Sequence, residues 1–177
     1  MVKRQSAFGS ASDDGALTTD ALWALLDQVM DPEVPVLSVV ELGIVRDVRQ
    51  GVDGVTVVIT PTYSGCPAMQ VIERDILSAL AARGIHEVRL ETVFSPAWTT
   101  DWMTDAAKAK LTAYGIAAPG KTEREDGLVT LTRRGSVACP YCRSTKTTIK
   151  SEFGSTACKS IHYCDSCKQP FEGFKAI

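Results

Sequence analysis

The chain has 177 residues, of which 45% are hydrophobic and 23% are charged, and its formal net charge is −2. This composition excludes a wholly disordered chain and a strongly basic nucleic-acid coat protein, and the length allows one domain plus a small second module. No apolar run approaches the roughly 20 residues of a membrane span, and the N-terminal sequence lacks the apolar core of a secretory signal. We therefore expect a cytoplasmic protein that is not bound to a membrane.

The first part of the chain predicts a tail, a helix and two strands. Residues 1–16 are rich in Ser, Ala, Gly and Asp and show no periodicity, which predicts a disordered tail. From Thr18 or Thr19 as the N-cap, apolar residues recur at helical spacing until two prolines end the helix. The β-branched runs over 36–48 and 55–59, separated by a Gly-rich turn, predict two strands of a hairpin.

A second helix, a third strand and a third helix follow. Pro67 stands at a favourable first helical position, and the apolar residues behind it form one helical face up to Gly84. Residues 86–94 predict a strand, and residues 101–114 predict a helix. The order helix, strand, strand, helix, strand, helix indicates a compact α/β or α+β domain over residues 17–114.

A change of charge separates this domain from the C-terminal module. Residues 115–127 are rich in Gly and Pro and then charged, so we expect a linker there. Residues 128–177 carry eight Lys or Arg against three acidic residues, a net charge of +5, whereas the remainder of the chain carries −7. The sequence therefore predicts two modules of opposite charge.

Two C-x-x-C pairs in the C-terminal module are the most specific signal in the sequence. Each pair places two thiolates in one tight turn, and two such turns can surround one ion tetrahedrally at about 2.3 Å. We predict a zinc ribbon over 128–177 with the ligands Cys139, Cys142, Cys164 and Cys167. A closed four-thiolate site leaves no position for a substrate, so the zinc is structural, and its removal is expected to unfold this module while sparing the first domain.

Other uses of these cysteines stay open. The pairs could be redox-active, and the same four thiolates could hold an iron-sulfur cluster. Cys158, a fifth thiol near the metal, is either a buried residue of the ribbon or an alternative ligand. The basic residues of the module are not interleaved with aromatic stacking residues, so an acidic protein partner is favoured over nucleic acid.

Cys66 lies between Gly65 and Pro67 at the start of the second predicted helix. A thiol at this position faces the unpaired N–H groups of the first helical turn, which favours the thiolate. A buried structural cysteine is the alternative. A nucleophilic enzyme would need a histidine beside the thiol, and neither His86 nor His162 is placed convincingly, so handling of a soft metal or cluster is favoured over acyl transfer.

Two segments carry a resemblance to a known family. DPEVPVLSVVELGIV followed by VITPTYSGCPAM resembles the iron-sulfur assembly family of small domains, whose pattern is D-P-E, then an acidic-Leu-Gly-hydrophobic-Val element, then T-x-x-x-C-P. The residues on the motif positions are Asp31, Glu33, Glu41, Thr62 and Cys66. Many relatives have Asp at the position of Glu41, so this chain keeps the carboxylate and changes its reach.

With a C-terminal ribbon that contains FGSTACKSIHYC, the chain is similar to the PaaD family of phenylacetate degradation proteins. The resemblance implies an accessory or maturation subunit of the phenylacetyl-CoA epoxidase (ring-1,2-epoxidase) system, whose oxygenase subunit is di-iron and whose reductase carries flavin and an iron-sulfur cluster. It also implies that the chain is not an enzyme by itself and that Cys66 transiently holds iron or an iron-sulfur cluster. A stand-alone cysteine-dependent thiol enzyme and a nucleic-acid-binding zinc ribbon protein are the alternatives, and homodimerisation is left open.

Overall fold

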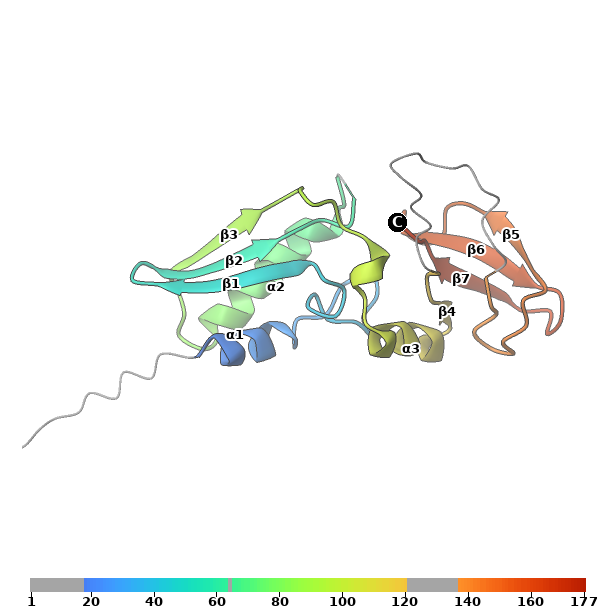
Figure 1. Cartoon of the computed structure of the whole chain (residues 1–177), viewed down its shortest axis with the longest axis horizontal. Coiled ribbons are helices and arrows are strands. Elements are labelled where there is room, and N and C mark those ends of the chain that lie inside the picture. The colour runs from blue at the N-terminus through green and yellow to red at the C-terminus, as the bar shows by residue number, and fades with distance from the viewer. Residues whose placement is uncertain (1–17, 64, 121–136) are drawn as a thin grey trace, which may run out of the picture.

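A computed structural model describes residues 18–63, 65–120 and 137–177 of the chain, so the predicted tail and residues 121–127 of the predicted linker lie outside the described residues. The first module contains α1 (Thr19–Leu26), β1 (Val45–Gly51), β2 (Gly54–Ile59), α2 (Ala68–Ala81), β3 (Val88–Thr92), the 3-10 helix η1 (Thr100–Trp102) and α3 (Asp105–Tyr114). The C-terminal module contains β4 (Ile116–Ala117), β5 (Thr147–Ser151), β6 (Lys159–Cys164) and β7 (Pro170–Phe174). The two modules lie side by side, with α3 between them (Figure 1), and the predicted order of helices and strands is confirmed.

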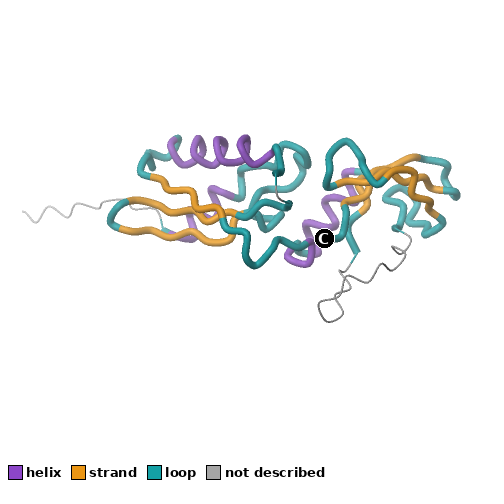
Figure 2. Tube along the Cα trace, turned by 90° about the horizontal axis from the view of Figure 1, so that it is seen from above, coloured by secondary structure: helices purple, strands orange, loops and turns teal. Residues whose placement is uncertain are grey.

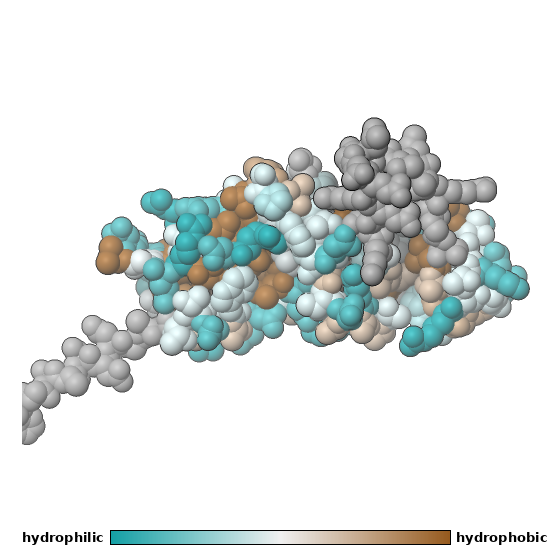
Figure 3. All heavy atoms as spheres, in the orientation of Figure 1, coloured by the Kyte–Doolittle hydropathy of each residue, from teal (hydrophilic) through white to brown (hydrophobic). Residues whose placement is uncertain are grey.

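The first module is an α+β domain built on a three-stranded sheet. β1 and β2 form an antiparallel hairpin, and β3 pairs parallel with β2 after the crossover through α2. Figure 2 shows α2 lying along one side of these strands, where its apolar residues are buried. Arg49 of β1 and Glu91 of β3 form an exposed ion pair of 3.1 Å, and hydrophilic and hydrophobic residues are interspersed on the side of this module seen in Figure 3. No helix in the described part of the chain is long and apolar enough to cross a membrane.

The segment between α1 and β1 differs from the expected strand over 36–48. It forms turns up to the start of β1. The backbone N–H of Ser38 donates to Glu41 Oε2 (3.1 Å), and the N–H of Glu41 donates to Ser38 Oγ (3.0 Å). Gly43 then adopts a left-handed φ of 71°, which a β-branched residue would avoid. These turns fold over the core and bury the apolar residues that suggested a strand, among them Leu37, Val39 and Leu42.

Two further boundaries differ from expectation for local reasons. The predicted helix over 101–114 is divided into η1 and α3, because the Thr104 side chain accepts a hydrogen bond from the N–H of Ala107 (3.1 Å) and starts a new helix. At the start of the expected linker, Gly115 ends α3 with a left-handed φ of 94°. The next two residues form β4, which is buried and pairs parallel with β7, so the ribbon sheet has the order β4-β7-β6-β5.

The ribbon shares the hydrophobic core of the first module. Cys158 and Phe174 are each 5% exposed and belong to the same buried cluster as the apolar residues of α1 and α2. The ring of Phe174 lies 6.3 Å from the ring of Trp98, whose Nε1–H donates to the carbonyl oxygen of Leu42 (2.8 Å). A smaller cluster inside the ribbon surrounds Phe171. The stability of the two modules is therefore coupled through packing.

Hydrogen bonds beyond β7 strengthen this junction. Thr99 Oγ1 donates to the carbonyl oxygen of Ile177 (2.6 Å), and the N–H of Thr100 donates to the same oxygen (3.1 Å). The N–H of Ile177 in turn donates to Thr100 Oγ1 (3.3 Å). The end of the chain thus docks against the segment that starts η1, as the position of the C-terminus in Figure 1 shows.

Replacing Phe174 by alanine tests the shared core. We expect Phe174→Ala to lower the free energy of unfolding of the whole chain by about 3–5 kcal/mol, because it leaves a cavity against Trp98. Urea unfolding followed by tryptophan fluorescence measures the change. Phe153→Ala is the matched control, because Phe153 is 69% exposed and contacts the Lys175 ammonium, so its loss should cost less than about 1 kcal/mol. Separate transitions for the two modules, with the first unchanged in Phe174→Ala, would contradict a shared core.

Candidate metal centre and thiol pocket

The four predicted ribbon cysteines converge on one point. The Sγ atoms of Cys139, Cys142, Cys164 and Cys167 all lie within 4.8 Å of one another. The Cys139 to Cys167 separation is 3.7 Å, and the Cys142 to Cys164 separation is 3.5 Å. Sulfur atoms bound at 2.3 Å on the corners of a tetrahedron lie about 3.8 Å apart. The four thiols therefore fit one tetrahedral metal ion whose ligand set is complete.

The two C-x-x-C turns repeat the same backbone geometry. Arg143 and Lys168, which directly follow the second cysteine of each turn, have left-handed φ angles of 62° and 61°. The N–H of Arg143 donates to the carbonyl oxygen of Cys139 (2.8 Å), and the N–H of Lys168 donates to that of Cys164 (2.9 Å). A left-handed conformation costs a residue with a side chain about 1–2 kcal/mol. Binding of one ion by both turns would offset that cost.

A pocket between the modules gathers most of the motif residues of the first domain. Its polar lining consists of Asp31, Glu33, Thr62, Cys66 and Cys158. The remaining lining is apolar and includes Phe174 of β7. Four of the five residues on the assembly-family motif thus meet in one place, and the ribbon supplies the fifth polar group.

Cys66 occupies the turn that precedes α2. Its N–H donates to the carbonyl oxygen of Tyr63 (3.3 Å), and its own carbonyl oxygen accepts from the N–H of Met69 (3.3 Å). Pro67 is the N-cap of α2 rather than its first helical residue, and no side chain caps this helix. The thiol is half-buried and packs against the core. It is therefore held at the start of a helix while remaining partly accessible.

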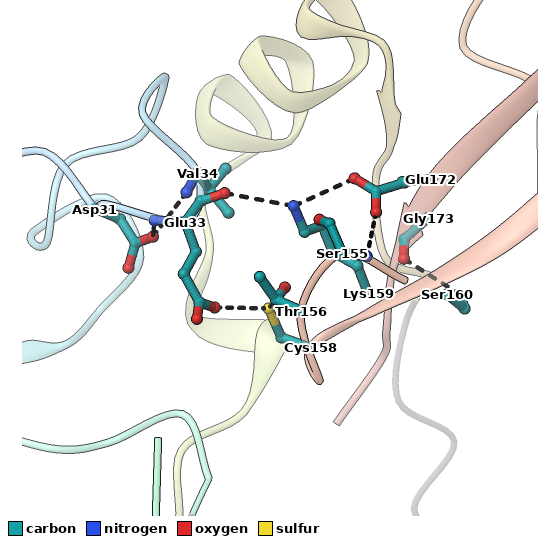
Figure 4. A network of polar contacts seen from close by, with 10 residues as sticks. All are labelled: Asp31, Glu33, Val34, Ser155, Thr156, Cys158, Lys159, Ser160, Glu172 and Gly173. Carbon is teal, nitrogen blue, oxygen red and sulfur yellow. Dashed lines mark hydrogen bonds and ion pairs between the residues drawn. The ribbon is translucent and has the colours of Figure 1, made fainter. Parts of the chain in front are cut away.

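The two acidic residues of the pocket have different tasks. Asp31 Oδ1 accepts the N–H groups of Glu33 and Val34, each at 2.8 Å, and so fixes the turn after α1. Burial raises the pKa of Asp31. Glu33 reaches across to the ribbon, where its Oε2 lies 3.6 Å from the Sγ of Cys158 and its carbonyl oxygen accepts from Lys159 Nζ (3.4 Å) (Figure 4). Asp31 shapes the loop, and Glu33 presents a carboxylate to a thiol.

The surroundings of Cys158 keep its thiol protonated. Its Sγ lies 3.0 Å from Thr156 Oγ1, and burial raises its pKa to about 11. The neighbouring Lys159 is buried and pairs with Glu172 (3.2 Å) (Figure 4). Burial alone would raise the pKa of Glu172, but the N–H of Ser155 and the Lys159 ammonium hold it below its usual value. The lysine charge is thus directed to Glu172 and to a backbone carbonyl.

Glu41 is not among the residues that line the pocket. Its carboxylate accepts the N–H of Ser38 and forms an ion pair of 2.5 Å with Lys110 of α3. These contacts fix the turn before β1 and tie it to α3. The carboxylate at this motif position therefore stabilises the fold of the first module.

Neither histidine lines the pocket. His86 is exposed. His162 is buried in the ribbon, where it stacks on Phe171 at a centroid distance of 5.3 Å and shares a hydrogen bond of 2.9 Å with Ser160 Oγ. The thiol-histidine arrangement of a nucleophilic enzyme is therefore not formed around Cys66 by these two residues.

Two residues near Cys66, Tyr63 and Cys158, were not predicted as its neighbours from the sequence. Tyr63 lies beside the thiols, and burial together with the nearby Cys66 raises its pKa to about 12. Cys158 lies outside the four-sulfur cluster and contacts Glu33, which is 125 positions earlier in the chain. No local pattern could have predicted that contact, because it depends on how the two modules pack.

Comparison with known proteins covers both modules. Residues 19–89 match the family model described as iron-sulfur cluster assembly protein, and residues 123–175 match the model described as PaaD zinc beta ribbon domain. A protein of Escherichia coli (strain K12), provisionally named as a subunit of 1,2-phenylacetyl-CoA epoxidase, is 46% identical over 156 residues, which cover 88% of this chain and 92% of that protein.

Other similar proteins cover about half of this chain. The Fe-S protein maturation auxiliary factor of Porphyromonas gingivalis (strain ATCC BAA-308 / W83) is 35% identical over 53% of this chain and 90% of its own length. The crystal structure of a DUF59 domain of unknown function from Bacillus anthracis covers 52% of this chain and 90% of its own, with 30% identity and a TM-score of 0.49.

Fold, cysteine cluster and comparisons together define a two-module protein, in which an iron-sulfur assembly domain is joined to a four-cysteine zinc ribbon. The 46% identity to the Escherichia coli protein covers most of both chains. The chain belongs to the PaaD family.

Alkylation of the metal-loaded protein tests the state of the two pocket thiols. We expect iodoacetamide to modify Cys66 first at neutral pH, because its thiol is half-buried, whereas Cys158 is buried with a pKa of about 11. Modification of Cys158 should accelerate as the pH rises toward that value, since the thiolate is the nucleophile. Peptide mass spectrometry over time measures both rates. Equal rates at neutral pH, or a fast phase that survives in Cys66→Ser, would contradict the assignment.

Proposed function

We propose that this protein is an accessory subunit of a phenylacetyl-CoA epoxidase system and assists assembly of the iron or iron-sulfur centre in its oxygenase and reductase partners. The observation that carries this proposal is the position of Cys66: a half-buried thiol at a helix start, in a pocket with Asp31 and Glu33. Membership of the PaaD family and similarity of the first module to an Fe-S protein maturation factor support the same role.

The chemistry of the proposal is ligand exchange without a redox step. Cys66 binds the incoming ferrous ion or cluster iron as a thiolate and releases its proton to solvent. Transfer reverses this step, because a partner thiolate or carboxylate replaces Cys66 on the iron and Cys66 is reprotonated. A half-buried thiol suits this exchange better than a closed four-sulfur site.

We further propose zinc as the resident ion of the ribbon. Cys139, Cys142, Cys164 and Cys167 would hold it, since their separations fit four thiolates around one tetrahedral ion. The bound ion supplies folding free energy to a module too small to form a large core of its own. The four cysteines then contribute to function by holding β6 and β7 against the first module.

Removal of the ribbon metal tests this second proposal. We expect one zinc per chain by metal analysis, and we expect Cys142→Ser to lose it. Because Cys158 and Phe174 pack into the first module, loss of zinc should also lower the urea midpoint of that module, which the sequence alone suggested would be spared. Stoichiometric iron and sulfide on these cysteines, or an unchanged midpoint after chelation, would contradict the proposal.

Cys66→Ser tests the role in maturation. The variant should keep the fold and the ribbon metal, because the two side chains are similar in volume. Partner subunits produced with it should contain much less iron, and their epoxidase activity should fall at least about tenfold, as expected when a metal ligand is lost. Iron content of the purified partners, thermal stability of the variant and its zinc content are the measurements. Glu41→Gln, which changes a carboxylate outside the pocket, is the control. Full partner activity with Cys66→Ser would refute the role.

A further inference from the structure

The pocket between the modules contains two thiols, one from each module. Cys66 comes from the turn before α2, and Cys158 comes from the segment directly before β6. Glu33 lies in the same pocket and already contacts Cys158. Thiols and carboxylates brought together from distant parts of a chain are a ligand set for a divalent cation of intermediate softness.

We propose that Cys158 and Glu33 complete the pocket of Cys66 as a second metal site, a mixed thiolate-carboxylate site for one divalent cation such as Fe²⁺. The inference rests on the proposed function and deepens it, because it makes the ribbon part of the cargo site in addition to its own four-cysteine centre. The site spans the module junction, so each module alone would hold only part of it.

The separation of Cys158 and Glu33 fits two ligands of one ion. A metal bound to sulfur at about 2.3 Å and to a carboxylate oxygen at about 2.1 Å, with a tetrahedral angle between them, places these atoms about 3.6 Å apart. The distance from Cys158 Sγ to Glu33 Oε2 is 3.6 Å. In the metal-free state the thiol proton occupies this contact. Binding replaces that proton with the cation and releases it to solvent, and the metal remains divalent.

The charges around this pair leave the carboxylate available to a cation. The nearest ammonium, that of Lys159, is engaged by Glu172 Oε2 (3.2 Å) and by the carbonyl oxygen of Glu33 (3.4 Å). Asp31 adds a second carboxyl group to the lining. A cation entering the pocket therefore meets acidic groups and thiols, while the neighbouring positive charge is already neutralised.

The site is open where the ribbon site is closed. Among the described residues, only the four ribbon cysteines bring three or more His, Cys, Asp or Glu ligand atoms within 4.8 Å of one another. Cys66 must therefore move toward the Cys158 and Glu33 pair to complete the pocket site. Gly65, which directly precedes Cys66, has a left-handed φ of 84°, a conformation that glycine adopts without strain. A site that closes by moving one turn binds more weakly and releases more readily than a preformed one.

Cobalt titration of the full chain tests this site directly. Co²⁺ alone is added without oxygen to zinc-loaded protein, and thiolate-to-cobalt charge-transfer absorption reports the second site. We expect the wild type to bind one additional Co²⁺ per chain. The charge-transfer signal should be lost in a Cys66→Ser and Cys158→Ser double variant and reduced in each single variant. Glu33→Gln should bind Co²⁺ at least about tenfold more weakly. Glu41→Gln, whose carboxylate lies outside the pocket, should bind as the wild type does.

The outcomes separate this inference from the proposed function. Unchanged cobalt absorption in Cys158→Ser, or no additional Co²⁺ in the wild type, would overturn the second site. The proposed function would still stand in either case if Cys66→Ser abolishes partner maturation. If Cys158→Ser does not retain its zinc and fold, Glu33→Gln and metal protection of Cys66 and Cys158 from alkylation in the wild type decide the question. Protection of Cys66 alone would also overturn the proposal.

Discussion

The interaction on which the rest of the structure depends is the insertion of Phe174 and Cys158 of the ribbon into the core of the first module. A module of this size cannot bury enough apolar surface to fold alone, so it needs a metal, a docking surface or both. Here the four cysteines are placed to hold the two turns around one metal ion, and Cys158 and Phe174 supply apolar side chains to a larger core. The ribbon therefore shares one hydrophobic core with the assembly domain.

This junction explains why the pocket lies where it does. The loop after α1 is held by Asp31, which accepts two backbone N–H groups, and that loop carries Glu33 to the start of β6. There the Lys159 ammonium ties the Glu33 backbone to Glu172 of β7, and the adjacent Cys158 turns toward the first module. Packing of the two modules and formation of the pocket thus follow from the same contacts.

Features set by local sequence could be predicted, and features set by contacts between distant segments could not. The ribbon cysteines follow from the geometry of a C-x-x-C turn, and the helices follow from apolar periodicity and caps such as Thr18. The segment before β1 looked extended because it is rich in valine, yet tertiary burial of its turns accounts for those side chains. β4 has two residues and gains its partner only from β7, and the contact between Glu33 and Cys158 spans 125 positions.

The two metal sites proposed for this chain would differ in their selectivity. A site of four gathered thiolates binds zinc in preference to ferrous iron, since affinity for such ligands rises along the first transition series from iron toward zinc. In the proposed pocket site, fewer thiolates, a carboxylate ligand and an incomplete geometry would all reduce the preference for zinc. With Cys158 outside the four-sulfur cluster, the two proposed sites would allow the same protein to retain one ion permanently and exchange another.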